Sequence, residues 1–300
     1  MAKFSIIIDI GKSFENIEKC LNSIYQQTFK DYEVIAINHT SDNRVSRILE
    51  RYKDKLKLIN EENLTLADVR NMRIEKASGE YILYINCNDY IEMNTLSILD
   101  KCTKKKIDVV RFQIRDVNEK MKENVISEIS FKTCCGNIAL EHIAKYKYVE
   151  QAYMYLFNLE YIKENNYKFE NKLNSDFGLI PYIIYNAKSV ISIGDILYNH
   201  LIDDVKTIKN YEDIKQEAYD TLYFSVQLLD KIQNNNININ NYIVKQIILK
   251  SANLKGKDYK DILSQIKKYN IINIMSSNKI NIKKLLCNID VKLAARLIKW

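Results

Sequence analysis

The stretch "YILYINCNDYIEMNTL" (residues 81–96) passes from an apolar segment into a polar tip and then into the start of a helix. The apolar segment predicts a buried strand, and the tip Asn86–Asp89 marks its end. In an α/β enzyme, such a strand end is where a metal ion and a phosphate often bind. This tip holds two amides and one carboxylate, so it is either a metal site or the remnant of one.

Outward from this stretch, strands and helices alternate along the first hundred residues. Apolar runs predict the strands, and apolar side chains at helical spacing predict the helices between them. Such alternation implies an α/β fold with a mostly parallel sheet, whose ligands bind at the carboxyl ends of the strands. The strands are expected at 4–8, 32–37, 56–60 and 80–86, with helices that include 43–53 and 65–77, the latter ended by Gly79.

The later chain follows a looser pattern. Residues 108–117 predict a further strand, and residues 139–165 are expected to be mainly helical. From about residue 210 to the end the pattern is helical. We therefore expect an α/β domain over 1–205, followed by a helical C-terminal region over 206–300.

Charge is unevenly distributed along the 300 residues, whose formal net charge is +7 at pH 7. Residues 255–300 contain eleven Lys or Arg and three Asp or Glu, whereas the rest of the chain is close to neutral. The basic, amphipathic segment 278–300 predicts either peripheral contact with an anionic membrane surface or a docked helix with a solvated lysine face, and we favour the second. Nucleic-acid binding is not expected, because no recognised motif accompanies the charge.

Composition argues against several other classes of protein. No run of about 18 apolar residues occurs, so a transmembrane helix is not expected, and the N-terminus enters a strand without a signal-peptide pattern. The six cysteines show no CxxC spacing and are accompanied by only three histidines, which argues against a structural zinc site. We expect a cytoplasmic protein, with a peripheral position on the inner face of the membrane as the alternative.

Motifs in the first third of the chain resemble those of a known family. The stretches "KCLNSIYQQTFKDYEVIAI" (19–37) and "ASGEYILYINCNDYI" (77–91) are similar to the nucleotide-binding half of family 2 glycosyltransferases, which have the GT-A fold. Residues 37–42 stand where that family has Asn-Asp-Gly-Ser-Thr-Asp, and residues 69–73 where it has Ala-Arg-Asn-x-Gly. The order and spacing of these motifs make the resemblance strong over residues 3–96.

The later chain carries a weaker part of this resemblance. The segment "LFNLEYIKENNYKF" (156–169) is similar to the one before the family's catalytic Glu-Asp pair, which would place Ser175 and Asp176 at that pair. The element "ILYNHL" (196–201) is similar to a later element of the family. Nothing after about residue 210 resembles it.

The resemblance implies a transferase that inverts the configuration of the sugar it moves. The donor would be a nucleotide sugar, UDP-linked, and the acceptor a glycan, a lipid-linked molecule or a protein. Asp176 would be the catalytic base that deprotonates the acceptor hydroxyl, and a divalent cation, Mn²⁺ or Mg²⁺, would neutralise the diphosphate at Asp89. The residues implied in donor binding are Asn38, Arg70, Asn71, Arg73, Asn86, Asn88 and Asp89.

This chain departs from the family where the chemistry is expected to lie. The Pro-x-Tyr-Asn loop is replaced by residues 9–12, the uracil-contacting aspartate by Asn38, and the Asp-x-Asp motif by residues 86–88. The changes from Asp to Asn in that motif remove two formal negative charges, so a divalent cation is expected to bind weakly or not at all. Arg73, in place of a family glycine, offers a guanidinium to a diphosphate and would partly replace the metal.

Three functions therefore compete: an active transferase with a metal-poor site, a catalytically inactive GT-A domain that binds a partner or a glycan, and a GT-A framework for another kind of ligand. The family resemblance favours the first, and the altered loops favour the second.

Several single residues also have a structural explanation that competes with the functional one. These are Asp42 as a helix cap, Asp89 as a cap of the next helix, Asp176 as a surface carboxylate, and His39 and His200 as structural or solvent-facing side chains.

Overall fold

The computed structural model describes residues 2–11, 14–61, 64–118, 123–126, 130–146, 149–202, 210–232, 236–274, 287 and 290–297. Packing divides the chain into two compact units. Unit 1 lies within 1–136, 151–171 and 186–206, and unit 2 within 137–150, 172–185 and 207–300. The predicted domain boundary between residues 205 and 206 stays a prediction, because compact packing units are not by themselves separately folding domains.

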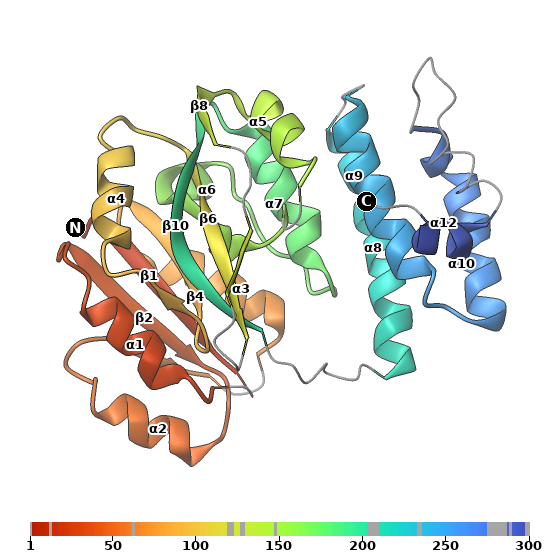
Figure 1. Ribbon diagram of the computed structural model, residues 1–300. Coiled ribbons are helices and arrows are strands. Elements are labelled where there is room, and N and C mark those ends of the chain that lie inside the picture. The colour runs from red at the N-terminus through yellow and green to blue at the C-terminus, as the bar shows by residue number, and fades with distance from the viewer. Residues whose placement is uncertain are drawn as a thin grey trace. The chain divides into compact units, whose positions relative to one another are not determined.

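Unit 1 is built on one sheet, to which ten strands of the described residues belong (Figure 1). Along its main path the order is β3-β2-β1-β4-β9-β6-β10-β5, with β7 paired to β6 and β8 paired to β10. The strands are β1 (Phe4–Ile10), β2 (Tyr32–Asn38), β3 (Lys57–Asn60), β4 (Tyr81–Asn86), β5 (Tyr90–Ile91), β6 (Val109–Asn118), β7 (Glu123–Ile126), β8 (Phe131–Cys134), β9 (Tyr155–Asn158) and β10 (Val190–Ile202).

The first four strands are parallel to one another, as predicted. Strand β9 differs from the sequence prediction, because residues 139–165 were expected to be mainly helical. Its four residues are buried and pair antiparallel with both β4 and β6, in the middle of the sheet. The pattern of so short a buried apolar run fits a strand and a helix equally well. Its pairing with β4 and β6, which are distant in sequence, makes it a strand, and the local sequence does not reveal that pairing.

The helices of unit 1 are α1 (Ile17–Tyr25), α2 (Asn43–Glu50), α3 (Leu66–Lys76), α4 (Thr95–Cys102) and α6 (Leu159–Glu164). A side chain caps the start of α2, α3 and α6, whereas the residues before α1 and α4 form no side-chain cap hydrogen bond. The Asp42 carboxylate accepts a hydrogen bond from the Arg44 backbone and so caps α2. This confirms the helix cap that the sequence analysis gave as the structural role of Asp42. Thr65 and Asp68 form a reciprocal capping box at the start of α3.

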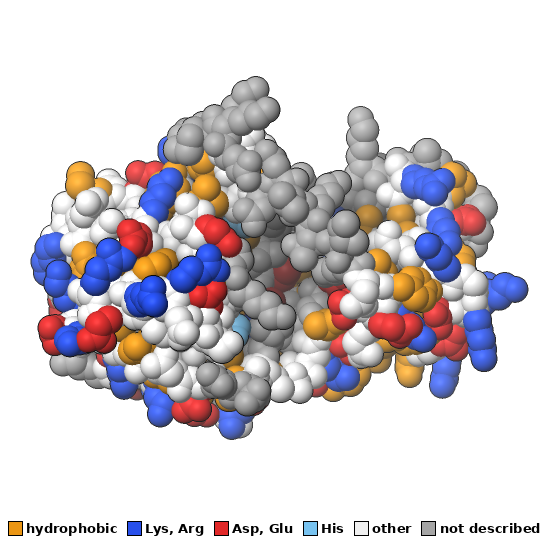
Figure 2. Space-filling model, turned by 90° about the horizontal axis from the view of Figure 1, so that it is seen from below, with side chains coloured by type: hydrophobic (Ala, Val, Ile, Leu, Met, Phe, Trp, Pro, Cys, Tyr) orange, Lys and Arg blue, Asp and Glu red, His pale blue; other side chains and the backbone are white. Residues whose placement is uncertain are grey.

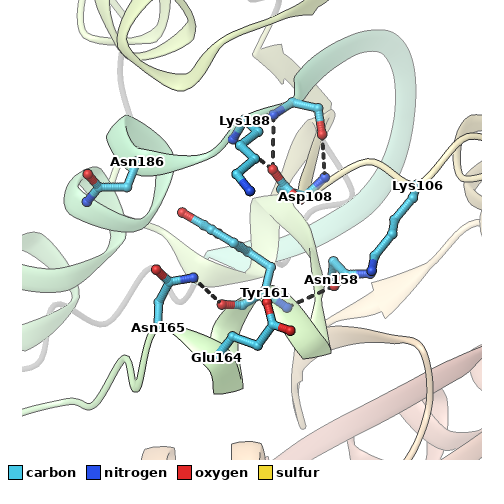
Figure 3. Close-up of a pocket in the computed structure, with 9 residues that line it drawn as sticks. Lys106, Asp108, Asn158, Tyr161, Glu164, Asn165, Asn186 and Lys188 are labelled. Atoms are coloured by element: carbon cyan, nitrogen blue, oxygen red, sulfur yellow. Dashed lines mark hydrogen bonds between the residues drawn. The ribbon is translucent and has the colours of Figure 1, made fainter.

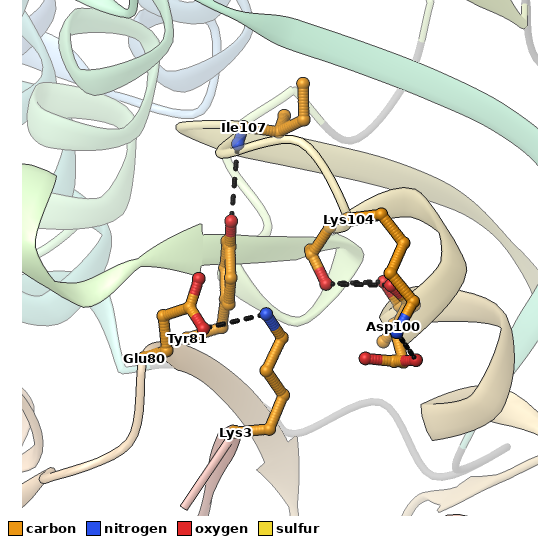
Figure 4. A network of polar contacts seen from close by, with 8 residues as sticks. Lys3, Glu80, Tyr81, Asp100, Lys104 and Ile107 are labelled. Atoms are coloured by element: carbon orange, nitrogen blue, oxygen red, sulfur yellow. Dashed lines mark hydrogen bonds and ion pairs between the residues drawn. The ribbon is translucent and has the colours of Figure 1, made fainter. Parts of the chain in front are cut away.

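The amino ends of several strands are joined by a polar network (Figure 4). Lys3, just before β1, donates to Glu80, just before β4, over 2.7 Å. The hydroxyl of Tyr81, the first residue of β4, accepts a hydrogen bond from the backbone N–H of Ile107. These contacts hold one end of the sheet together, so the functional site is to be sought at the opposite, carboxyl end.

Gly79 lies where two segments of unit 1 approach each other closely. Sequence reasoning assigned it to the end of the helix over 65–77, but α3 ends at Lys76 with Ala77 as its cap, so that assignment was wrong. A Cβ at Gly79 would lie 2.7 Å from the backbone nitrogen of Ser5 and 2.8 Å from the carbonyl carbon of Phe4. Residue 79 must therefore be glycine because β1 passes against it.

Replacing Gly79 by Ala is expected to lower the free energy of unfolding by about 1–3 kcal/mol, because the added methyl group forces backbone apart. Urea denaturation of the purified chain measures this change. Gly194→Ala is the matched control, since the nearest atom to its added Cβ would be 4.0 Å away. Equal stability of the two variants would contradict the close approach at residue 79.

Unit 2 contains helices whose apolar faces meet in a common core. Its described helices are α5 (Gly136–Ile143), α7 (Ser175–Asn186), α8 (Tyr211–Lys231), α9 (Ile237–Ser251), α10 (Gly256–Lys268), the short 3₁₀ helix η2 (Ile271–Ile274) and α12 (Val291–Leu297). Core residues include Leu222 of α8, Ile247 of α9 and Ile262 of α10. This arrangement agrees with the helical pattern predicted from residue 210 onward.

The basic tail predicted over 278–300 falls mainly outside the described residues. Its described part includes α12, where Val291 and Ala294 join the core of unit 2. On the face of unit 2 seen in Figure 2, Lys and Arg side chains are interspersed with Asp and Glu. No helix among the described residues is long and apolar enough to cross a membrane.

Candidate active site

Polar side chains meet at the carboxyl ends of four neighbouring parallel strands. Asp9 of β1 is in register with Asn86 of β4, and Asn38 of β2 is in register with Asn60 of β3. Ile10 pairs with Asn38, so the ends of β1 and β2 also coincide. This edge is where a doubly wound α/β fold binds its ligands.

Asp9 is the centre of a charged cluster at this edge. Arg73 of α3 donates from Nη2 to one carboxylate oxygen of Asp9, and His39 Nε2 lies 2.9 Å from the other. Burial by itself would raise the pKa of Asp9, but the Arg73 charge and the His39 contact outweigh it, so this pKa lies below its usual value. Asp9 is therefore held as a carboxylate between two basic side chains.

Two arginines of α3 bring positive charge to the same place. The Arg73 guanidinium lies 5.5 Å from the centre of the Tyr84 ring, and its buried Nε has no hydrogen-bond partner among the described residues. The Arg70 guanidinium lies 5.5 Å from the centre of the Phe169 ring, and its charge also contributes to the lowered pKa of Asp9. A guanidinium is a suitable donor to diphosphate oxygens, because its N–H groups form a planar fork.

Two of the predicted donor-binding amides have structural partners. Asn38 donates to the Asn60 side chain over 2.9 Å and accepts a hydrogen bond from the Thr40 backbone. Asn71 binds the backbone of Phe169 with both its carbonyl and its amino group. Asn71 thus joins α3 to the segment that follows α6. Binding of a donor by either amide stays a prediction.

Asp89, the predicted metal ligand, is only 2 % exposed. Its carboxylate accepts hydrogen bonds from the Tyr198 hydroxyl over 2.6 Å, from the Leu201 backbone over 2.9 Å and from the Asn86 side chain over 2.9 Å. Burial raises the pKa of Asp89 above its usual value, although the His200 charge and these hydrogen bonds oppose that rise. Both carboxylate oxygens are thus engaged within the fold, where they join β4 to β10.

The other residues of the tip also serve the fold. The Asn88 side chain accepts a hydrogen bond from the Asn16 backbone just before α1, over 3.0 Å. Cys87 is buried, and burial raises the pKa of its thiol to about 12, so it remains protonated at neutral pH. Among the described residues, no group of three or more His, Cys, Asp or Glu could hold a metal ion. The tip itself offers two uncharged amides and one carboxylate whose two oxygens are engaged within the fold, and this set of ligands does not fit a divalent cation.

Asp176, the predicted base, belongs to unit 2, whereas the strand-end residues belong to unit 1. It lies in the first turn of α7 and is half-buried. A carboxylate in the first turn of a helix is stabilised in its charged form by the helix dipole. The role of Asp176 in catalysis stays a prediction.

Sequence reasoning missed several contacts of this site. His39 pairs with Asp9, and His200 lies 3.0 Å from Asp116. These contacts agree with the structural role expected of both histidines, but their partners were not predicted. The Tyr198 hydroxyl, which binds Asp89, was not singled out either. The signal available for Asp9 was its position at the start of the altered loop, directly after the strand predicted over 4–8.

A cavity of about 550 Å³ lies elsewhere in unit 1, at the end of the sheet where β6 and β10 begin (Figure 3). Its lining includes Lys106, Asp108, Tyr161 and Lys188, and no predicted site residue is among them. The Asp108 carboxylate is already bound by the backbone N–H groups of Lys188 and Ser189. Despite its size, this cavity is not the candidate active site, because no predicted site residue lines it and its Asp108 carboxylate is already engaged.

Parallel strands with polar side chains at their carboxyl ends, and arginines of α3 beside them, define an α/β protein with a candidate ligand site at those strand ends. The family model described as "Glycosyl transferase family 2" matches residues 5–178. The chain belongs to this family.

Curated relatives and solved structures agree with this assignment. The chain is 26% identical over 206 residues to the poly(ribitol-phosphate) beta-N-acetylglucosaminyltransferase TarS of Staphylococcus aureus, covering 64% of this chain and 34% of TarS. It is 24% identical over 213 residues to the cholesterol galactosyltransferase of Borreliella burgdorferi, covering 66% of this chain and 60% of that one. The chain thus spans about a third and three fifths of the length of these two relatives.

The fold has a counterpart in a solved structure. The crystal structure of S. aureus TarS 1–349 in complex with UDP-GlcNAc matches with a TM-score of 0.73 at 16% sequence identity. The match covers 98% of this chain and 89% of that chain. The predicted α/β fold of the GT-A type, with helices at the C-terminal end, is confirmed.

Proposed function

We propose that this chain is an inverting glycosyltransferase that moves a sugar from a UDP-linked donor to a hydroxyl of a glycan, a lipid-linked molecule or a protein. Support comes from the family match over residues 5–178 and from the fold shared with a structure that contains UDP-GlcNAc. The activities named for the two relatives make poly(ribitol-phosphate) and cholesterol the first acceptors to test.

The observation that carries this proposal is the cluster of Arg73, Arg70 and Asp9 beside the parallel strand ends. A nucleotide sugar leaves a diphosphate whose negative charge must be stabilised as the glycosidic bond breaks. Arg73 is held by Asp9 and Tyr84, and its Nε–H has no partner among the described residues, so the guanidinium is oriented before a ligand arrives. We propose that Arg73 and Arg70 bind the diphosphate, and that Asn38 binds the base through its amide.

The reaction follows from these roles. The acceptor oxygen attacks the anomeric carbon, the carbon–oxygen bond to the diphosphate breaks, and its electron pair goes to the departing phosphate oxygen. The acceptor proton passes to the Asp176 carboxylate. Since the attack comes from the face opposite the leaving group, the configuration inverts. No step is assigned to a metal ion, because the residues at the tip do not fit one.

A second candidate function is that of a catalytically inactive GT-A domain that binds a glycan or an active transferase. The observation that favours it is the carboxylate of Asp89, which three hydrogen bonds engage within the fold. The amides at 86 and 88 bring no charge that would replace it. This candidate predicts glycan binding without donor turnover.

Calorimetric titration with UDP and a panel of UDP-linked and GDP-linked sugars separates these functions. We expect at least one UDP-sugar to bind, with an affinity that is the same in EDTA and in Mn²⁺, because the positive charge comes from arginine. Release of UDP, with water or an added acceptor as the nucleophile, then measures turnover. Binding of no donor under either condition would refute the transferase and favour the inactive domain.

A further inference from the structure

A loop in unit 2 leads directly into the helix that carries Asp176. Residues 172–174 form this loop, and Asn174 adopts a left-handed backbone conformation with a φ of 62°. Helix α7 begins at the next residue, Ser175. The path of the loop therefore sets the direction in which the first turn of α7 projects its side chains.

This loop is held by one buried carboxylate of α8. Asp220 is 3 % exposed and accepts a hydrogen bond from the Leu173 backbone over 2.9 Å. The Lys172 side chain lies 3.4 Å from the same carboxylate, and Gln216 donates to it over 3.0 Å. A buried carboxylate with three donors is a strong anchor, because its charge makes each hydrogen bond stronger than a neutral one.

The neighbouring residue of α8 completes the attachment. Asn174 donates from its side chain to the Thr221 hydroxyl over 3.0 Å. Thr221 in turn donates to the Glu217 carbonyl within α8 over 2.6 Å. Asn174, just before α7, is thus attached to α8 through its own side chain, and the preceding residue, Leu173, is attached to α8 through its backbone N–H.

Helix α7 packs closely against α8 near the loop, which restricts movement of one helix relative to the other. A Cβ at Gly178 would lie 2.2 Å from the ring of Phe224, so α7 passes directly against that ring. Phe224 is itself 3 % exposed. The two helices are therefore fixed against each other one turn beyond the loop.

We propose that Asp220 and Thr221 are positioning residues for the Asp176 carboxylate: they hold the loop over 172–174 and so aim the first turn of α7. This inference rests on the proposed role of Asp176 as the base. It assigns α8, which lies beyond the region matched by the family model, a part in the catalytic apparatus. A chain truncated near residue 205 would lose this support.

Asp220→Ala is expected to lower kcat for UDP release by about 10- to 100-fold, because a base displaced by about 1 Å loses that much rate. The dissociation constant for UDP should not change, since Asp220 belongs to unit 2 and the proposed donor-binding residues to unit 1. Asp261→Ala is the control: its exposed carboxylate also accepts side-chain hydrogen bonds in unit 2, from Tyr219 and Gln265, and neither of these partners belongs to the loop.

A double mutant tests whether Asp220 acts through Asp176. If it does, adding Asp220→Ala to Asp176→Asn lowers the remaining rate of UDP release no further. An equal fold-loss in both backgrounds would overturn the proposal, as would an unchanged kcat in Asp220→Ala. If Asp176→Asn alone leaves kcat unchanged, the base assignment and the positioning role fall together, whereas a failure confined to Asp220 leaves the proposed function standing.

Hydrogen exchange gives a readout that does not depend on activity. Asp220→Ala removes the acceptor of the Leu173 N–H, so exchange in a peptide covering 172–178 should become faster, while Asp261→Ala should leave it unchanged. Thr221→Val serves if Asp220→Ala does not fold, since it removes one hydroxyl and keeps the shape. Unchanged kcat and unchanged exchange in Thr221→Val would overturn the role of the second anchor.

Discussion

Replacing Asp176 by Asn is expected to lower the rate of sugar transfer by about 10²–10⁴-fold, the range that loss of a general base produces. The amide keeps the size of the side chain but cannot take the acceptor proton at neutral pH. Binding of the donor should be unaffected, because the proposed donor-binding residues lie in unit 1 and Asp176 in unit 2. UDP release under saturating donor measures the rate, and calorimetry with UDP measures the affinity.

Glu212→Gln is the matched control for this variant. Glu212 is an exposed acidic residue in the first turn of α8, so its replacement removes the same charge from an equivalent position in the same unit. Both variants should lose a similar, small amount of stability from the helix dipole, about 0.3–1 kcal/mol. Turnover of Asp176→Asn equal to that of Glu212→Gln would remove Asp176 as the base and leave a surface carboxylate.

Replacing Arg73 by Ala is expected to have two separable effects. Donor affinity should fall by about 10- to 100-fold, because a hydrogen bond to a charged group contributes about 1.5–3 kcal/mol. The free energy of unfolding should also fall by about 1–3 kcal/mol, because Asp9 loses its main partner in a mostly buried position. Calorimetry with UDP and urea denaturation measure the two effects independently.

The double variant Arg73→Ala/Asp9→Asn separates ligand binding from folding. Removing the Asp9 charge should restore much of the lost stability, because no uncompensated carboxylate is then left at the strand ends. Donor affinity should stay low, since the guanidinium is still missing. Recovery of donor binding in the double variant would show that Arg73 acts only on Asp9 and does not bind the diphosphate.

The pH dependence of stability follows from the lowered pKa of Asp9. A carboxylate whose pKa is lower in the folded than in the unfolded chain contributes stability above its unfolded pKa, about 3.9. This contribution is lost as pH falls through the lower, folded pKa. The difference in unfolding free energy between the wild type and Arg73→Ala should therefore be largest at neutral pH and should narrow as the medium becomes acidic below that unfolded pKa.

Much of the fold was predictable from local pattern. The strands near 4–8, 32–37 and 80–86 are continuous apolar runs, which is what burial on both faces of a parallel sheet requires. The helices between them follow from apolar spacing and from caps such as Asp42. Strand β9 was not predictable in this way, because four buried residues fit a helix equally well until their partners in β4 and β6 are known.

The candidate site was predictable in location but not in its contacts. Parallel order alone brings Asn38 and Asn86 to the same edge of the sheet, since strand ends coincide when strands are in register. The partner of Arg73 was not predictable, and neither was the burial of Asp89. Both depend on side chains of strands distant in sequence, Asp9 of β1 for Arg73 and Tyr198 of β10 for Asp89.

The sequence by itself determined the family, the alternation of strands and helices, and the composition of the polar tip, which has two amides and one carboxylate. Those properties are local, because they depend on the order and type of neighbouring residues. Only the tertiary structure decided that Arg73 binds Asp9 across 64 positions, and that Asp89 binds Tyr198 across 109. A hydrogen bond or an ion pair forms between groups a few ångströms apart in space, however far apart the two residues lie along the chain. These partners therefore depend on how the fold places the strands and helices beside one another.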